Sequence, residues 1–381
     1  MVSLLRNNRG IIILLFILYQ VMMPTIAVYT GVLRLFPTFI LTLFLVLGLS
    51  IWKNAKASKM FSIISLFCIY IIINAFITDS AYDNTYITVI RSTFWCWCYF
   101  LSYCLFNKKV LEIAKYDQYT IFLTFIFIIV FIFVHSFNTR STLENEGDNV
   151  IFYSLMLLPW IALMSNKYKK IALFALISFC VISSLKRSSL VILVISLVLI
   201  IYFDFFYKTR LTKSTIFLIL LSVISLFTVY HFASERFDII SERMAAIEED
   251  GGSGRDLIFE DVYNRYNNKE LQERVFGSGF DAVRRESKYS VAVSAHNDFL
   301  EVLYDFGILG FILYILIHLS LIKWVFVLYK TNNILLPSVL ISYFCFLLMS
   351  LVSHLVLYPT YFGILTSFWA YAYCKYRQQS A

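Results

Sequence analysis

Long apolar stretches separated by short polar connections dominate this chain. A run of about 20 predominantly apolar residues is long enough for a helix to cross the hydrocarbon core of a bilayer. Periodicity and length together predict about twelve such helices, at residues 11–30, 34–52, 60–78, 85–106, 119–137, 150–166, 171–186, 188–206, 214–232, 297–322, 334–353 and 356–374. The expected fold class is therefore an all-α integral membrane protein, a polytopic bundle of transmembrane helices with one large external loop.

The composition supports this class. Of the 381 residues, 60% are hydrophobic and 15% are charged, whereas soluble chains are about 45–50% apolar and about 25% charged. All seven cysteines fall in or beside apolar spans, so they are expected to be small buried hydrophobes and not a disulfide framework or a metal site.

Basic residues gather in alternate connections between the predicted spans. With the N-terminus inside, the cytoplasmic connections carry Lys53, Lys56, Lys59, Lys108, Lys109, Lys115, Lys167, Lys169, Lys170, Lys208, Arg210, Lys213, Lys323 and Lys330. Lysine and arginine in short loops set orientation, so both termini are predicted to be cytoplasmic. The net charge of +8 follows from these loops and does not indicate nucleic acid.

One connection, Ala233–Ser294, is long and lies on the predicted outer side. It holds nine basic and thirteen acidic residues, a net charge of −4. The chain is thus expected to consist of helices over residues 1–232, an external loop subdomain over residues 233–294, and further helices over residues 295–381.

An amphipathic helix is predicted inside this loop. Glycines Gly251, Gly252 and Gly254 break the chain, and Ser253 and Asp256 stand three apart like a capping box. The stripe formed by Ile258, Val262 and Tyr266, with Phe259 and Tyr263 beside it, has helical spacing.

Four arginines are candidates for binding an anion. Arg255 is expected in the first turn of the amphipathic helix, where free N–H groups favour phosphate, although a solvated surface arginine fits the same pattern. Arg187 follows a predicted helix that ends at Leu185 and has only about 15 residues, or about 23 Å, against a core of about 30 Å. It should therefore lie inside the bundle and needs an anionic partner, either substrate or a carboxylate such as Glu301. Arg91 suits substrate binding or a structural ion pair, and Arg284 is a further candidate for substrate binding.

His296 is the candidate general base. It stands at the boundary between the loop and an apolar helix, and an imidazole that titrates near pH 6.5 can accept a proton from a hydroxyl. Asn297 could orient the substrate or the ring, and Glu301 or Asp298 could fix its tautomer or compete as base. The alternative is a structural histidine, which is how we interpret His135, His231, His318 and His354.

Other chemistries lack their motifs. The sequence has no P-loop, no dinucleotide-binding glycine pattern and no nucleophile elbow. Pairs of His or Asp ligands at metal spacing are absent from the outer face, so neither a metal nor a cofactor is expected. What remains is a set of arginines and one histidine on the external side, which suits displacement of a pyrophosphate leaving group.

The order of these motifs resembles the O-antigen polymerase and O-antigen ligase superfamily of bacterial envelope polysaccharide assembly. The resemblance rests on S-x-x-x-R at Ser183–Arg187, S-G-R at Ser253–Arg255, A-H-N-D-F-L-E at Ala295–Glu301 and the D-F-G-I-L-G string that follows. It implies transfer of a glycan from undecaprenyl pyrophosphate to an acceptor hydroxyl on the periplasmic side of the inner membrane. Arg187 and Arg255 would bind the donor pyrophosphate, and His296 would activate the acceptor.

Four functions are compatible with these observations. The H-N-D-F-L-E string at His296–Glu301 favours a polymerase of O-antigen or capsule repeat units, and a ligase that attaches glycan to the lipid A core is the first alternative. A transporter or flippase of the lipid-linked unit is the rival from another class, although transporters usually bind near the midplane. A scaffold in an assembly complex is the third. Expected partners are the undecaprenyl-pyrophosphate-linked oligosaccharide, the lipid bilayer and a chain-length regulator protein, with no nucleic acid.

Overall fold

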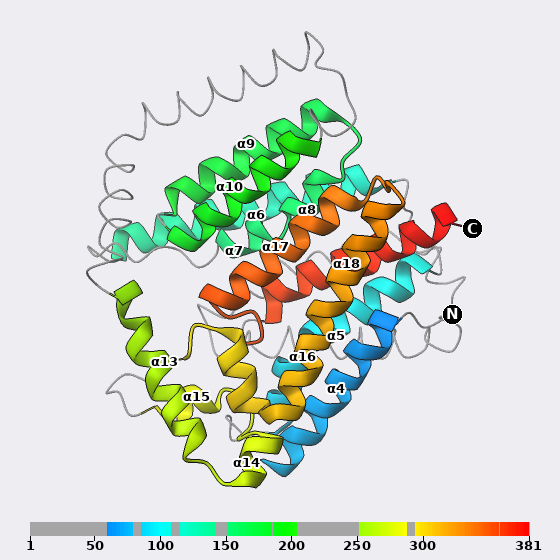
Figure 1. The fold of residues 1–381 in the computed structure, drawn as a ribbon. Coiled ribbons are helices and arrows are strands. Elements are labelled where there is room, and N and C mark those ends of the chain that lie inside the picture. Colours follow the sequence, from blue (N-terminus) through cyan, green and yellow to red (C-terminus); the bar gives the residue numbers. More distant parts are fainter. Residues whose placement is uncertain are drawn as a thin grey trace. The chain divides into compact units, whose positions relative to one another are not determined.

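The computed structural model of the chain describes residues 59–78, 85–107, 115–141, 151–184, 186–203, 251–287, 294–357 and 359–380. Within these ranges every regular element is a helix (Figure 1). The helices belong to two compact units. One consists of residues 1–116, 254–333 and 346–381, and the other of residues 117–253 and 334–345.

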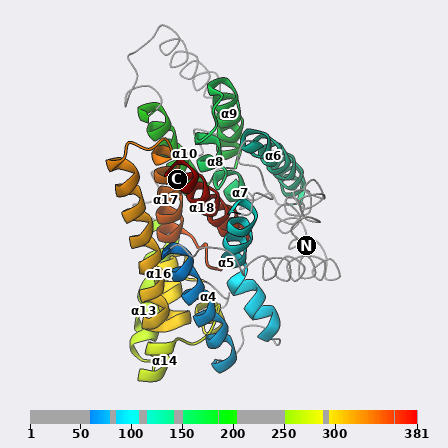
Figure 2. The ribbon, with the colours of Figure 1, turned by 90° about the vertical axis from the view of Figure 1, so that its right-hand side faces the viewer.

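The first unit contains the helices that surround the predicted histidine motif. Helix α18 (Pro359–Ser380) packs along α5 (Thr85–Asn107), and α4 (Lys59–Ile77) packs against both α5 and α16 (Asp298–Lys330). Figure 2 shows α4 running beside α16. Aromatic rings fill the α5–α18 contact, including Trp95 stacked on Phe362 with ring centroids 4.5 Å apart.

Helix α16 is longer than predicted and is kinked. It extends to Lys330 where the sequence predicted an end at residue 322, and Gly307 interrupts it with φ 64° and ψ −171°. Tyr70 of α4 donates a hydrogen bond to the Phe306 carbonyl oxygen at 2.7 Å, next to this kink. The same hydroxyl donates to the Phe276 carbonyl oxygen of α14 (Leu271–Phe276) at 2.9 Å. The kink is therefore a junction of three helices.

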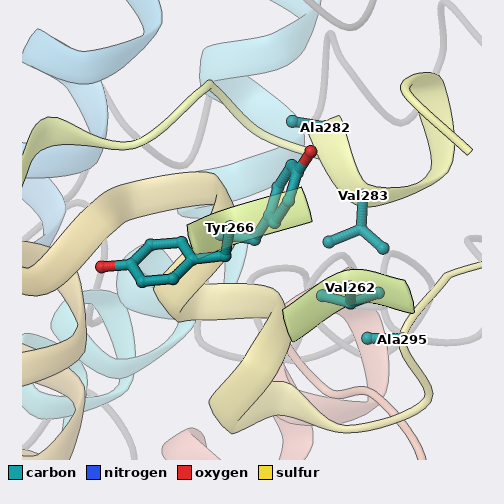
Figure 3. Packing of buried hydrophobic residues seen from close by; sticks show 6 residues of the cluster. Val262, Tyr266, Ala282, Val283 and Ala295 are labelled. Atoms are coloured by element: carbon teal, nitrogen blue, oxygen red, sulfur yellow. The ribbon is translucent and has the colours of Figure 1, made fainter. Parts of the chain in front are cut away.

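The predicted amphipathic helix is confirmed as α13 (Gly251–Asn267). Its Val262 and Tyr266 form a buried cluster with Ala282 and Val283 of α15 (Ala282–Arg285) and with Ala295 (Figure 3). Ile258 packs against the cluster, as the stripe predicts, whereas Tyr263 is 57% exposed. The capping box is wrong, because α13 already includes Gly251 and Gly252, and Ser253 inside a helix cannot be its N-cap.

The second unit contains α6 (Tyr116–Ser141), α7 (Ile151–Leu155), α8 (Leu158–Ala162), α9 (Lys167–Ser183) and α10 (Arg187–Ile201). Helix α17 (Leu336–Val352) contributes residues to both units. The single helix predicted at residues 150–166 is wrong, because the segment divides into α7 and α8. Pro159 stands in the first turn of α8. A proline ring clashes with the carbonyl four residues earlier, here at Leu155, where α7 ends.

The remaining predicted spans have different outcomes. Helices are confirmed at residues 60–78, 85–106, 119–137, 171–186, 188–206, 334–353 and 356–374, with shifted ends. The spans at 11–30, 34–52 and 214–232 lie outside the described residues. Among the described helices, α4 and α16 are long and apolar enough to cross a membrane, and four shorter helical stretches are apolar as well.

Candidate functional site

The histidine motif forms the start of α16. Asn297 is the N-cap of this helix, and its side-chain oxygen accepts a hydrogen bond from the Leu300 N–H at 3.1 Å. The Asn297 side-chain amide also donates to the Leu351 carbonyl oxygen at 3.2 Å, which ties the cap to α17. His296 precedes the cap with φ 51°, a left-handed conformation that is uncommon for residues other than glycine. This conformation turns the chain sharply before the helix begins.

The three carboxylates of the motif lie on one face of α16 and are all buried. Asp305 accepts hydrogen bonds from the N–H groups of Asp281 and Ala282, at 2.6 and 2.9 Å. These contacts satisfy free donors at the N-terminus of α15. The Asp305 carboxylate therefore holds the segment at the start of α15 against α16.

The carboxylates of Glu301 and Asp298 hold two other segments against α16, again by accepting hydrogen bonds from backbone N–H groups. Glu301 Oε2 accepts from the Ala295 N–H at 2.7 Å, directly before His296. Asp298 accepts from the N–H groups of Leu355 and Val356 at 2.9 and 3.2 Å, in the turn that follows α17. The Glu301 Oε1 atom is buried and has no hydrogen-bond partner among the described residues. Glu301 was predicted to bind substrate, and this role stays a prediction.

His296 stacks on a second histidine. The ring centroids of His296 and His354 are 4.8 Å apart, with an interplanar angle of 30°. His354 is only 7% exposed, and burial, together with the nearby His296 and Arg255, lowers its pKa to about 3. The positive charge of Arg255 in α13 is one of the influences that lower this pKa. The fold therefore stacks the predicted base on His354, and one predicted phosphate-binding arginine acts electrostatically on the same imidazole.

Arg255 is the fifth residue of α13 and is half-buried. It lies about one turn further into the helix than the sequence predicted, because α13 starts at Gly251. The cluster around Val262 and Tyr266 anchors this helix to the first turns of α16, with Leu300 and Leu303 packed against it. Contacts on one side of α13 thus determine where Arg255 lies.

Arg284 and Arg91 are both linked to Asp281. Arg284 forms an ion pair with the Asp281 carboxylate within the α15 turn. Burial raises the pKa of Asp281, and the positive charges of Arg284, Arg285 and Arg91 oppose that rise. Arg91 is exposed at its position in α5, and its charge has the smallest of these influences on Asp281. The substrate-binding roles of Arg91 and Arg284 remain predictions.

Arg187 is the first residue of α10 and belongs to the second unit. Helix α9 before it has 17 residues, about 25 Å at 1.5 Å per residue, which is shorter than a bilayer core of about 30 Å. Helix α10 thus begins at Arg187, one residue before the predicted start at residue 188, and the Arg187 side chain lies outside the described residues. No group of three or more His, Cys, Asp or Glu side chains able to hold a metal ion occurs in the described part of the chain.

A family comparison covers the segment that carries most of these residues. Residues 172–315 match the O-antigen ligase family. The match includes Arg187, Arg255 and His296, and it confirms the resemblance that the sequence motifs indicated. The match supports a membrane enzyme of O-antigen assembly. A comparison with curated proteins gave no match.

His354 is the residue at the site that sequence reasoning overlooked. It lies beyond residue 315, outside the matched segment, in the short connection between α17 and α18. The string S-H-L at Ser353–Leu355 contains no motif, so a buried structural histidine was the natural interpretation. The Asp298 hydrogen bonds to Leu355 and Val356 hold this connection at the start of α16.

Proposed function

We propose that this protein is an integral-membrane glycosyltransferase that polymerises O-antigen or capsule repeat units carried on undecaprenyl pyrophosphate. The observation that carries the proposal is the stacking of His296 on His354, whose pKa is lowered by burial, by His296 and by the positive charge of Arg255. A base beside a cation is what glycosyl transfer from a pyrophosphate donor requires, since one group receives a proton while the other meets a departing anion.

In the proposed reaction, the acceptor hydroxyl oxygen attacks the anomeric carbon of the donor sugar. A new C–O bond forms, the bond from that carbon to the pyrophosphate oxygen breaks, and the bonding electrons leave with the undecaprenyl pyrophosphate. His296 takes the hydroxyl proton. Guanidinium groups of Arg255 and Arg187 bind the donor pyrophosphate, because a planar fork of N–H donors matches phosphate oxygens. In this scheme the arginines occupy the place that a metal ion takes in other enzymes.

The surface of the long helices supports a location in the membrane. Large apolar side chains are exposed along α4 and α16, including Ile69, Phe76, Ile312, Leu319 and Phe326. Helices with this many exposed large apolar side chains are unusual in soluble proteins and fit contact with lipid. The cytoplasmic termini and the external position of the active site follow from the pattern of basic residues, and the bacterial inner membrane and the periplasm follow from the family resemblance; all belong to the proposal. A chain-length regulator as partner stays a prediction.

The test is complementation of a strain that lacks this chain. We expect the wild-type chain to restore long-chain surface glycan on a gel, and His296→Ala to restore none at an equal protein level, with lipid-linked units still present. Arg187→Lys should also fail to restore long-chain glycan, because an ammonium group cannot make the bidentate hydrogen bonds that a guanidinium makes to phosphate. Lys330→Ala, an exposed charge at the far end of α16, is the control. Long-chain glycan from His296→Ala would refute the base assignment.

The glycan pattern of the same deletion strain distinguishes a polymerase from the second candidate function, a ligase. The description of the matched family favours the ligase. A missing polymerase leaves single repeat units attached to the lipid A core. A missing ligase leaves a bare core and polymer still on its lipid carrier. Accumulation of repeat units on the inner leaflet would instead indicate a flippase.

A further inference from the structure

We infer that His354 is a positioning residue for His296, holding the imidazole in the orientation in which it accepts the proton of the acceptor hydroxyl. This inference rests on the proposed function and extends it to a residue outside the segment that matches the family. Nothing in the sequence motifs assigns a role to His354.

The backbone around His354 is held by the helix that His296 begins. Asp298, the first residue of α16, accepts hydrogen bonds from the N–H groups of Leu355 and Val356. Its carboxylate also accepts from the Tyr314 hydroxyl at 3.1 Å. Asp298 is two residues after His296, and Leu355 directly follows His354. One carboxylate therefore sets the separation between the two histidine backbones.

The side chains complete this arrangement. His354 is 7% exposed and covers one face of the His296 ring at 4.8 Å, so that face is closed to water and to substrate. Packing against His354 leaves the His296 side chain fewer available rotamers. The left-handed backbone conformation of His296 restricts its side-chain rotamers further. The substrate must then approach His296 from the remaining face or edge. Misplacement of a catalytic group by about 1 Å can cost about 100-fold in rate.

The charge state of His354 agrees with this role. Burial and the neighbouring His296 and Arg255 keep it neutral at physiological pH. When His296 receives the hydroxyl proton it becomes a cation, and a neutral ring against it adds no repulsion. A protonated second histidine at this distance would oppose that step.

His318 provides a matched control from the same unit. It is also a buried histidine, 5% exposed, and its ring stacks on Phe346 at 4.1 Å and on Phe299 at 5.2 Å. Its partners are thus aromatic residues of the helix packing and not His296. If any buried histidine were needed only for stability, substitutions at His318 and His354 should have the same kind of effect.

The experiment compares His354→Leu, which fills the volume without a ring, with His354→Phe, which keeps a ring. The probe is lipid-linked repeat unit extracted from the deletion strain, and initial rates are measured against its concentration with full-length protein in nanodiscs. We expect His354→Leu to lower kcat by about 10- to 100-fold, with KM for the donor within about twofold of wild type. His354→Phe should stay within about threefold of wild type, and so should His318→Leu.

A wild-type kcat for His354→Leu overturns the inference. An equal loss of kcat in His354→Leu and His354→Phe also overturns it, because such a result would mean that the ring nitrogens of His354 are needed and that packing of a ring is not sufficient. A rise in KM with unchanged kcat would assign His354 to substrate binding instead and also overturn it. If the leucine variant does not fold, His354→Asn replaces it. Wild-type activity in His296→Ala would refute the proposed function, whereas an inactive His296→Ala beside a fully active His354→Leu would refute this inference alone.

Discussion

Single residues at the start of α16 divide into two groups with different tasks. The buried carboxylates of Asp298, Glu301 and Asp305 accept hydrogen bonds from backbone N–H groups of three separate segments. An intramolecular hydrogen bond stabilises by about 0.5–1.5 kcal/mol, and loss of one partner leaves the other buried and unsatisfied. The histidines lie between these fastened segments. The carboxylates thus build the site, and His296 faces His354 within it.

The pKa of His354, lowered to about 3 by burial and by His296 and Arg255, predicts an acid-sensitive fold. In the unfolded chain a histidine titrates near pH 6.5. As the pH falls from about 6.5 toward 3, the unfolded chain binds a proton at this position and the folded chain does not. The free energy of unfolding therefore decreases with falling pH in this window, by about 2 kcal/mol at pH 5.

His354→Phe removes this titrating group while keeping a ring. We expect thermal unfolding in nanodiscs to show a smaller drop in melting temperature between pH 7.5 and pH 5 for His354→Phe than for wild type. Equal drops in the two proteins would contradict the assignment of a neutral buried imidazole at residue 354.

At the scale of elements, the backbones of α14 and α16 approach each other closely at two glycines, Gly277 and Gly307. A side chain at Gly307 would place its Cβ 2.4 Å from the Val275 carbonyl oxygen, and one at Gly277 would place it 2.2 Å from the Asp305 carbonyl oxygen. Both glycines have positive φ, 64° and 87°. The Ser278 and Gly279 N–H groups then donate to the carbonyls of Tyr304 and Asp305. The kink in α16 is the place where the loop segment joins the helix.

Gly307→Ala should therefore disrupt this junction. Alanine is strained at φ 64° and ψ −171°, a region that only glycine populates readily, and its Cβ would meet backbone that cannot move aside. We expect a loss of about 3 kcal/mol or more in folding stability, seen as a lower melting temperature and shorter surface glycan. Ile308→Ala, at the exposed neighbouring residue, is the control and should differ little from wild type.

At the scale of the whole molecule, the distribution of charge predicts how the chain sits in the membrane. Lysine and arginine gather in alternate connections, and the long acidic loop falls on the opposite side from them. The residues of the candidate site that belong to the first unit, His296, His354 and Arg255, come from that loop or from the adjoining ends of apolar helices. The active site is therefore expected to face the periplasm.

Reporter fusions test this orientation. Alkaline phosphatase fused after Ser287 should be active, because that enzyme works only outside the cytoplasm, and the same reporter fused after Ala381 should be inactive. Green fluorescent protein at the C-terminus should fluoresce. An active phosphatase at Ala381 would place the C-terminus outside and invert the proposed topology.

Apolar run length predicted most helices of the described chain, because span length and the 3.6-residue period are local properties. The amphipathic stripe of α13 was recognised for the same reason. Local pattern failed where a single residue acts on the backbone. Pro159 divides a predicted span into α7 and α8, and Gly307 kinks α16 within an otherwise continuous apolar run.

By itself the sequence determined the helical class of the described chain and indicated the residues proposed to carry its chemistry, Arg187, Arg255 and His296, since composition and motif spacing are local properties of the chain. Only the tertiary structure decided what surrounds His296. Asp298 and Leu355 are 57 positions apart, and their hydrogen bond brings His354 onto the His296 ring. Such a contact depends on how α16, α17 and the turn after α17 pack together, and no local pattern of hydrophobic and polar residues encodes it.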